Sequence, residues 1–368
     1  MNTKQQNVVI VHIFPPHLHR MEAEKDLKEV LSLLETYGHA DVLTVIQRRA
    51  LPDAHTYVGK GKVEEMQDIV KDQKIDVIVI NDIVKPGQLF NLTKLFWKIN
   101  PNIAVWDRVD LILNIFDKHA HTAEAKLQIK LARMRHMGPR MYGLGGTVLS
   151  RQGGGIGTRG IGETNTELMK RHWRSETKKV EDELRRLTNN RERQLERRRK
   201  IGLETISIVG YTNAGKSTLF NLMAKKKKKA ADELFATLDA TVGKLWLPQR
   251  SKEILVSDTI GFIQNLPAKL IKAFRSTLME AMDARMLLHV IDASDPDMDL
   301  KIRVVEDVLE ELGINNKPTI YVFNKIDELT KPQMINLLDR YDELNPQLIS
   351  AYENIGMPEL MEEIGRRY

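Results

Sequence analysis

The stretch Ile206-Ser-Ile-Val-Gly-Tyr-Thr-Asn-Ala-Gly-Lys-Ser-Thr218 decides the fold of this chain. Its first four residues form a buried-strand pattern, and a helical pattern begins at Lys216. Gly210 and Gly215 permit backbone angles that other residues resist, so successive N–H groups can converge on one anion. The N-terminus of the following helix adds its dipole at the same point. Strand, glycine loop and helix in this order predict a phosphate-binding loop in a doubly wound α/β sheet.

The loop assigns a role to each of its polar residues. Lys216 is expected to bridge the β- and γ-phosphates of a nucleoside triphosphate and to act in catalysis, and Ser217 is expected to ligate Mg²⁺. The predicted phosphate-binding set is Gly210, Tyr211, Thr212, Asn213, Ala214, Gly215, Lys216, Ser217 and Thr218.

Two further segments complete the predicted phosphate and metal site. Asp258-Thr-Ile-Gly261 follows the buried run from Ile254 to Ser257, so Asp258 is placed to hold Mg²⁺, and the Gly261 N–H to sense the γ-phosphate during hydrolysis. Between the loop and Asp258, a threonine is expected to close over the metal and the γ-phosphate. Thr237 is the preferred candidate for this metal-binding and catalytic role, with Thr241 in reserve.

A third motif predicts which base is bound. Asn324-Lys-Ile-Asp327 follows a buried strand, and the Asp327 carboxylate can accept both the ring N–H and the exocyclic amine of guanine. Adenine presents the wrong edge, which argues against a helicase-like or transport ATPase. Lys325 is expected to lie along the base. Ser350 and Ala351 are expected to offer a backbone N–H to the guanine oxygen.

The residue after Gly261 predicts slow hydrolysis. Many GTPases use a glutamine there to orient the attacking water, but this chain has Phe262, which cannot bind water through its side chain. Gln264 stands two residues further on. We expect slow intrinsic turnover that a macromolecular partner completes.

The patterns divide the chain into three predicted parts. Residues 1–106 alternate between strand and helix, which indicates a small, mostly parallel α/β domain. Residues 107–200 read as two long amphipathic helices forming an antiparallel hairpin, joined by a glycine-rich loop at 138–162. Residues 201–368 return to strand–helix alternation and form the doubly wound nucleotide-binding domain.

Composition places the chain in a broad class. There is no cysteine among its 368 residues, which fits a reducing compartment and excludes a disulfide framework. The N-terminus lacks a signal-peptide pattern, and no apolar run approaches the ~18 residues that span a bilayer. We therefore expect a cytoplasmic, soluble protein.

Positive charge is concentrated in two places. Residues 170–200 hold 13 Lys and Arg against 6 Asp and Glu, and Lys225–Lys229 is a run of five lysines. The rest of the chain is net acidic although the whole carries +6. A local excess of this kind is typical of a surface that meets RNA, and the plainer reading is a solvated helix face. The candidate RNA-binding residues are Arg151, Arg159, Arg185, Arg186, Arg197, Arg198 and Arg199.

The motifs together resemble one family. The segments 209–221, 234–239 and 258–262 are similar to those of HflX-type GTPases in the Obg–HflX superfamily, and so are Val58-Gly-Lys-Gly-Lys62 and Ser150-Arg-Gln-Gly-Gly-Gly-Ile-Gly157 upstream. The resemblance covers roughly residues 58–365. A match to both the glycine-rich segment and the GTPase motifs is far more specific than a phosphate loop alone.

The resemblance implies a Mg²⁺-dependent GTPase that binds GTP and GDP and associates with the large ribosomal subunit and its rRNA. Such proteins split or rescue stalled ribosomes under stress, so we expect hydrolysis to be stimulated by the ribosome and the protein to be monomeric away from it. The alternative is a signalling switch whose basic hairpin binds a protein or an anionic membrane surface, because electrostatics alone does not name the polyanion.

Overall fold

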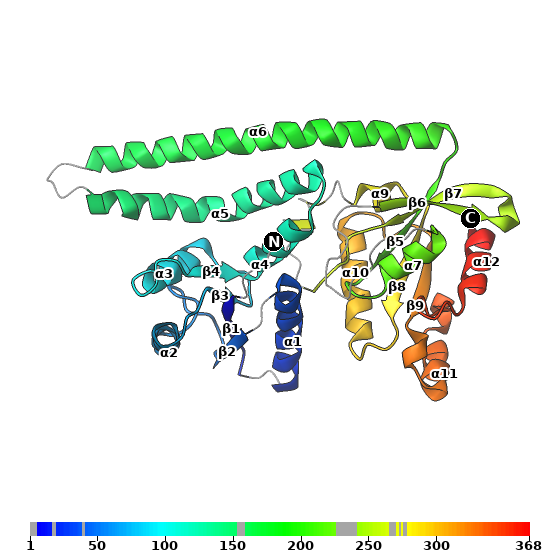
Figure 1. Ribbon diagram of the computed structural model, residues 1–368, viewed down its shortest axis with the longest axis horizontal. Helices are drawn as coiled ribbons and strands as arrows, with labels where there is room; N and C mark the ends of the chain where they lie inside the picture. Colours follow the sequence, from blue (N-terminus) through cyan, green and yellow to red (C-terminus); the bar gives the residue numbers. More distant parts are fainter. Residues whose placement is uncertain are drawn as a thin grey trace. The chain divides into compact units, whose positions relative to one another are not determined.

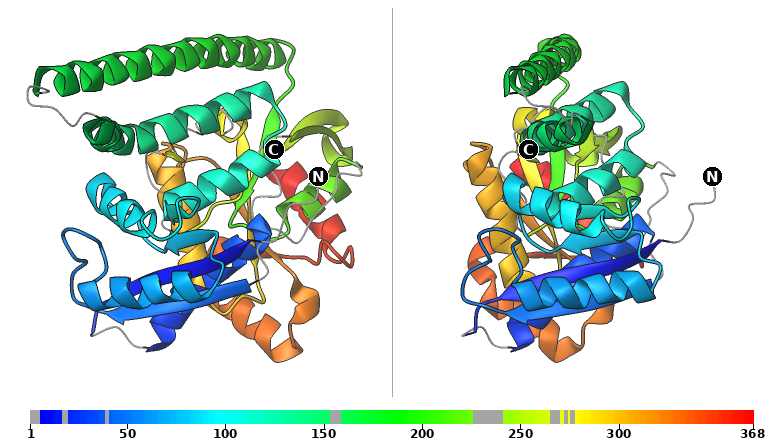
Figure 2. Two further views of the ribbon diagram at one scale, coloured as in Figure 1. Left: turned by 60° about the vertical axis from the view of Figure 1, so that its left-hand side comes forward. Right: turned by 90° about the vertical axis from the view of Figure 1, so that its left-hand side faces the viewer.

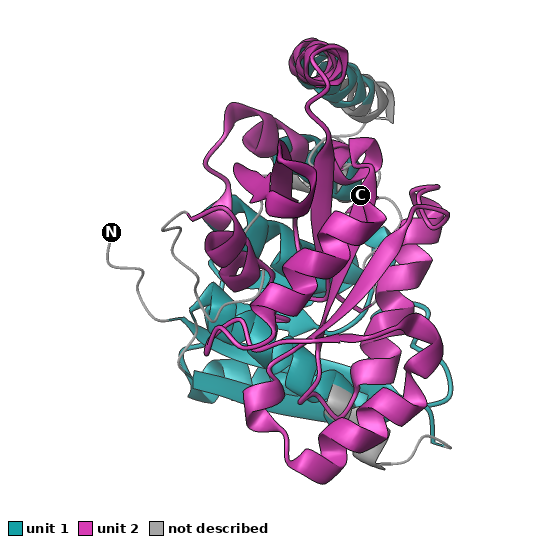
Figure 3. Cartoon of the chain, turned by 90° about the vertical axis from the view of Figure 1, so that its right-hand side faces the viewer, with its two compact units in different colours: residues 1–118, 129–183 teal, residues 119–128, 184–368 magenta. Residues whose placement is uncertain are grey.

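The structure is a computed structural model that describes residues 6–16, 20–38, 41–152, 159–225, 241–264, 270–271, 274 and 278–368. The side chains at 20–23, 25, 139–152 and 159–166 are outside that description. Contacts divide the chain into two compact units (Figure 3). Unit 1 comprises residues 1–118 with 129–183, and unit 2 comprises 119–128 with 184–368.

Unit 1 contains a four-stranded, wholly parallel sheet in the order β2-β1-β3-β4 (Figure 2). Its strands are β1 (Asn7–Phe14), β2 (Asp41–Arg48), β3 (Val77–Ile80) and β4 (Ala104–Asp107), and its first three helices are α1 (Arg20–Tyr37), α2 (Lys60–Asp72) and α3 (Pro86–Phe96). The apolar side chains of α2 and α3 form a core with alternate residues of the strands, among them Val9, Ile78 and Phe96. The predicted βαβ pattern of the N-terminal part is confirmed.

The helical region opens with a break that the sequence did not predict. The apolar spacing from Leu111 to Met137 suggested one helix, but the structure has α4 (Arg108–His119) and then α5 (Ala123–Gln152). The Thr122 hydroxyl accepts a hydrogen bond from the Ala125 N–H at 3.1 Å and so caps the start of α5. A threonine cap competes with helix continuation, which is why the periodicity alone missed it.

The predicted glycine-rich loop at 138–162 is too long. The α5 helix continues to Gln152, and α6 (Arg159–Lys200) begins before the predicted loop ends (Figure 1). Residues 153–158 lie outside the described part. Glycine in a helix costs only about 1 kcal/mol relative to alanine, so it does not by itself end one. At Gly138 the missing side chain has a packing reason, because a Cβ there would meet Trp173 Nε1 of α6 at 2.9 Å.

Contacts within unit 1 pair α5 and α6 in antiparallel order. Arg135 forms an ion pair with Glu181 at 2.8 Å, and further along α5 Gly138 packs against Trp173. The Trp173 indole also donates to the Met134 carbonyl at 3.2 Å. The expected antiparallel arrangement of the two helices is therefore present where their side chains are described.

Unit 2 is built on a six-stranded sheet in the order β10-β9-β8-β5-β7-β6. The strands are β5 (Thr205–Gly210), β6 (Thr241–Leu247), β7 (Lys252–Asp258), β8 (Met286–Asp292), β9 (Thr319–Asn324) and β10 (Gln347–Leu348). All neighbours are parallel except β6, which runs antiparallel to β7 at the edge. The predicted strands at 206–209 and 254–257 and the strand before Asn324 are confirmed as β5, β7 and β9, whereas β6 and β10 were not predicted.

Helices complete unit 2. They are α7 (Lys216–Met223), α9 (Met279–Asp283), α10 (Met298–Glu311), α11 (Lys331–Arg340) and α12 (Met357–Arg367), with short 3-10 turns η1 (Pro248–Arg250), η2 (Ile326–Glu328) and η3 (Asp342–Leu344). Side chains of α7 and α12 share a core with the sheet, including Phe220, Ile254 and Ile364. No helix in the described residues is long and apolar enough to cross a membrane.

Candidate nucleotide site

The loop between β5 and α7 has the geometry that a phosphate cradle needs. Gly210 and Gly215 have φ of +150° and +90°, and a side chain at either would collide with Val290 O or with Asn324 Nδ2. Asn213, with φ +63°, is also left-handed. Val290 and Asn324 therefore pack closely against the loop, and only glycine fits at positions 210 and 215.

Residues after β7 are joined to this loop through the backbone. The Thr212 N–H donates to Phe262 O at 2.8 Å, and the Phe262 N–H donates to Gly210 O at 3.1 Å. A Cβ on Gly261 would lie 2.7 Å from Thr212 Cγ2 and 3.0 Å from Lys216 Nζ. The structure thus brings the predicted γ-phosphate sensor Gly261 against the phosphate loop, while the Phe262 side chain is buried.

Lys216 is enclosed by the loop. Only 7% of it is exposed, and its ammonium donates to the Tyr211 carbonyl. Burial lowers the pKa of Lys216 to about 8, and the nearby Asp258 carboxylate opposes that shift. A buried ammonium at the N-terminus of α7 attracts phosphate oxygens electrostatically.

Two of the three residues predicted to hold a metal are in contact. Ser217 Oγ donates to Asp258 Oδ2 at 2.8 Å, although 41 residues separate them in the chain. Asp258 is completely buried. A hydroxyl and a carboxylate side by side are oxygen ligands of the type that Mg²⁺ prefers. The third candidate, Thr237, lies outside the described residues.

Asn324 links the phosphate loop to both base-binding segments. Its amide donates to Ala214 O at 2.9 Å, and its Oδ1 accepts the Ala351 N–H at 2.8 Å. Asp327 is exposed within η2, and Ser350 is fully buried with its hydroxyl accepting the Glu353 N–H at 3.0 Å. The four predicted segments, far apart in sequence, therefore meet at the carboxyl ends of β5, β7 and β9 and beside β10.

One acidic residue at this edge of the sheet was not predicted from the sequence. Asp292 ends β8, and its Oδ2 lies 2.6 Å from Lys325 Nζ. A signal was present, since Asp292 follows a buried strand just as Asp258 and Asn324 do.

The basic end of α6 has one face committed to intramolecular ion pairs. Arg198 makes two contacts of 3.1 and 3.0 Å with Glu280 of α9, and Arg191 lies 3.6 Å from the same carboxylate. Arg199 pairs with Asp283 at 2.6 Å. Glu280 is only 3% exposed, and a buried carboxylate needs hydrogen-bonded ion-pair partners of this kind. Arg198 and Arg199 were predicted to contact RNA, and the structure gives both an internal partner.

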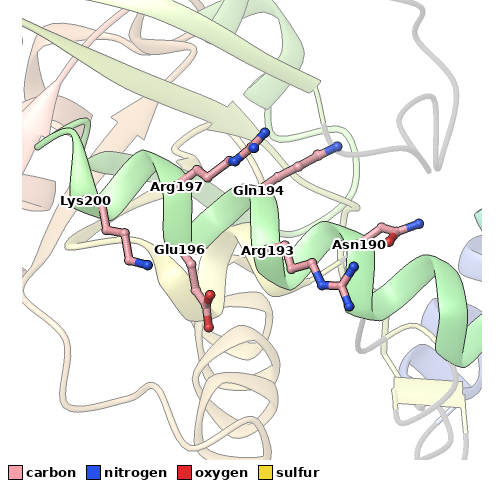
Figure 4. A pocket seen from close by; sticks show the side chains of 6 residues that line it. All are labelled: Asn190, Arg193, Gln194, Glu196, Arg197 and Lys200. Atoms are coloured by element: carbon pink, nitrogen blue, oxygen red, sulfur yellow. The ribbon is translucent and has the colours of Figure 1, made fainter.

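The opposite face of α6 carries exposed polar side chains. Side chains from three turns line a hollow of about 540 Å³ (Figure 4). The residues are Asn190, Arg193, Gln194, Glu196, Arg197 and Lys200. All six are exposed, and no described carboxylate pairs with Arg193, Arg197 or Lys200. We call Arg193, Arg197 and Lys200 the outer basic face.

The fold and the site define a P-loop GTPase, with a phosphate loop, a serine–aspartate pair and an asparagine-linked base motif on one sheet edge. Comparison with known proteins makes the assignment specific. Residues 24–117 match the family described as "GTP-binding GTPase N-terminal", residues 119–198 "GTP-binding GTPase Middle Region" and residues 205–325 "50S ribosome-binding GTPase".

Curated relatives agree over nearly the whole length. The chain is 43% identical to "GTPase HflX" of Caldanaerobacter subterraneus over 365 residues, which is 99% of this chain and 80% of that protein. It is 39% identical to "GTPase HflX" of Escherichia coli over 98% of this chain and 83% of the relative. The chain belongs to the HflX GTPase family and is a GTP hydrolase that binds GTP and GDP.

Solved structures support the fold. A crystal structure titled "SsGBP and GDP complex" aligns over 98% of both chains with a TM-score of 0.55 and 22% identity. A GTP-binding protein of Sulfolobus solfataricus in complex with GDP aligns over the same share of each chain with a TM-score of 0.50 and 22% identity.

Proposed function

We propose that the GTP cycle of this protein controls its association with the large ribosomal subunit, and that in the GTP state it splits or rescues stalled ribosomes. The family is one of ribosome-binding GTPases. The observation that carries the proposal for this chain is the outer basic face of α6. Its three cations lie in a region of net positive charge and have no described acidic partner, which suits contact with RNA phosphates.

The helical repeat explains why some arginines bind inward and others face outward. At about 100° per residue, Arg193, Arg197 and Lys200 fall on one side of the helix, whereas Arg191 and Arg198 fall together on the other. The inward pair neutralises Glu280. The outward group is thus exposed and has no described acidic partner, so an RNA can reach it, and Arg185 and Arg186 are exposed about two turns before it. Arg151 and Arg159 have side chains outside the described set, and they remain candidates.

In this proposal, GTP binding and hydrolysis at the nucleotide site determine when the protein associates with the ribosome. Ser217 and Asp258, together with Thr237, would hold Mg²⁺. The ion neutralises charge on the phosphates when it is bound. Lys216 and the Gly261 N–H would stabilise charge on the γ-phosphate. Because Phe262 is buried and cannot orient water, the ribosome is proposed to complete the catalytic site.

We also propose three functional parts, residues 1–106, 107–200 and 201–368, with the middle part and the N-terminal domain reaching rRNA and the last part switching with nucleotide. The protein is proposed to act as a monomer away from the ribosome.

The test is co-sedimentation with large subunits in GTP-analogue, GDP and nucleotide-free states, with subunit splitting and GTP turnover measured in the same samples. Wild-type protein is expected to bind in the GTP-analogue state and to hydrolyse GTP faster with ribosomes. The combined variant R193Q/R197Q/K200Q should bind more weakly. The slope of the logarithm of its binding constant against the logarithm of salt concentration should become less steep by up to about two to three, because each phosphate contact contributes roughly 0.7–0.9 to that slope.

A matched control removes three positive charges elsewhere in unit 2. The variant K244Q/R303Q/K331Q replaces three exposed residues and should leave the salt dependence unchanged. Absence of ribosome binding by the wild type at low salt would refute the proposal. Association that survives ribonuclease would favour the alternative, a switch that binds a protein or an anionic membrane surface.

A further inference from the structure

We propose that Asp292 is a positioning residue for guanine recognition: its carboxylate holds the Lys325 side chain in place beside the base before nucleotide binds. This inference rests on the assignment of Asn324–Asp327 as the base motif and is independent of any ribosomal role.

The placement of Asp292 follows from strand register. Asp292 and Asn324 are the last paired residues of the neighbouring strands β8 and β9. Just beyond them, the Ala293 N–H donates to Asn324 O at 2.9 Å. The backbone that presents Lys325 is therefore fixed to the backbone that presents Asp292.

Both oxygens of the Asp292 carboxylate are occupied. Oδ2 contacts Lys325 Nζ at 2.6 Å, while Oδ1 accepts the Ser294 N–H at 3.1 Å and the Ser294 hydroxyl at 2.7 Å. The contacts to Ser294 fix the direction of the carboxylate, so it offers the lysine one defined position. The two side chains are only 26% and 16% exposed, which reduces screening by solvent.

Lys325 needs such a partner for two reasons. Its backbone is left-handed, with φ +65°, so the chain turns sharply at this residue. The direction of the side chain therefore depends on a contact that holds its far end. Its four-carbon stem also has several rotatable bonds, which lose freedom when a base packs against them. A lysine that is already ordered by Asp292 binds the base without that loss.

The expected effect falls on affinity and not on chemistry. Asp292→Asn keeps the shape and the hydrogen bonds from Ser294 but removes the charge. It should weaken binding of GDP and GTP by the same factor, about three- to fivefold, the size expected for a partly exposed ion pair. KM for GTP should rise by a similar factor, and kcat at saturating GTP should stay unchanged.

A double-mutant cycle tests whether Asp292 acts through Lys325. GDP affinity is measured by calorimetry for the wild type, D292N, K325A and D292N/K325A. D292N should have no further effect once Lys325 is alanine. The control E253Q removes another ion pair of unit 2, Lys244–Glu253, and should bind GDP like the wild type.

Three results overturn the inference: unchanged GDP affinity in D292N, an equal loss in the presence and absence of Lys325, or a fall in kcat without a change in KM. If the wild type binds GDP no better than ADP, the base-motif assignment itself is wrong. Normal guanine selectivity that is insensitive to D292N contradicts only the role of Asp292.

Discussion

Lys216 makes nucleotide binding depend on pH. Burial holds its pKa near 8 in the nucleotide-free protein, below about 10.4 for lysine in an unfolded chain. Between these values the unfolded state binds the extra proton, so the stability of the nucleotide-free protein should rise with pH in that window. Phosphates favour the ammonium, so GDP affinity should instead fall as pH rises through about 8, by at most about tenfold per unit.

Calorimetry of GDP binding from about pH 7 to 8.5, in buffers of different ionisation enthalpy, measures this effect. Proton uptake on binding is expected to grow toward the upper end of the range. The control K244M lacks an exposed lysine outside the site and should show the same uptake. Binding without proton uptake would show that Lys216 is already charged throughout.

Asp327 should set the base preference. Replacing its carboxylate by an amide in Asp327→Asn removes the acceptor for the guanine N–H groups and offers a donor that suits a xanthine oxygen. We expect GDP affinity to fall by about 10²-fold or more and xanthosine diphosphate to become the better ligand. Competition binding with both nucleotides measures this, and the neighbouring exposed Glu328→Gln is the control. An unchanged preference would contradict the assignment of Asp327.

At the scale of the elements, the α6–α9 contact is expected to stabilise unit 2. Glu280 is buried and satisfied by Arg191 and Arg198. Glu280→Gln removes the carboxylate that pairs with Arg198, while Arg191 keeps its ion pair with Glu124 at 3.2 Å. Breaking such a pair costs about 3 kcal/mol or more, whereas Glu253→Gln, in an exposed pair, should cost less than about 1 kcal/mol. Urea unfolding monitored by tryptophan fluorescence compares the two. Equal effects would show that the buried pair contributes little.

The helices also show where sequence patterns fail. Apolar spacing found the long basic helix α6, and the predicted alternation of strand and helix over residues 1–106 is present in unit 1. The glycines suggested a loop across 138–162, but glycine at position 138 serves a close approach of Trp173 and not a turn. Such a contact lies between segments distant in sequence, so no local pattern reports it.

At the scale of the molecule, the two units should respond differently to nucleotide. GDP binds unit 2, so at a free concentration of 100 times its Kd it should stabilise that unit by about 2.7 kcal/mol. Hydrogen exchange of the β5, β8 and β9 amides that open only by global unfolding should slow by roughly 100-fold. Amides of β1 and β3 in unit 1 should change little. Equal slowing in both units would show that they unfold as one.

The sequence by itself determined the nucleotide chemistry and most of the strands, because a phosphate loop needs glycine at Gly210 and Gly215 and buried strands need unbroken apolar runs. It also located the positive charge on residues 170–200. Only the tertiary structure decided which of those charges have an internal partner: Arg198 and Arg199 form ion pairs with α9, while Arg193, Arg197 and Lys200 have no described acidic partner. It likewise revealed Asp292 beside Lys325. Local patterns record what each segment can become, but the partner of a charged side chain depends on which distant segments the fold brings together.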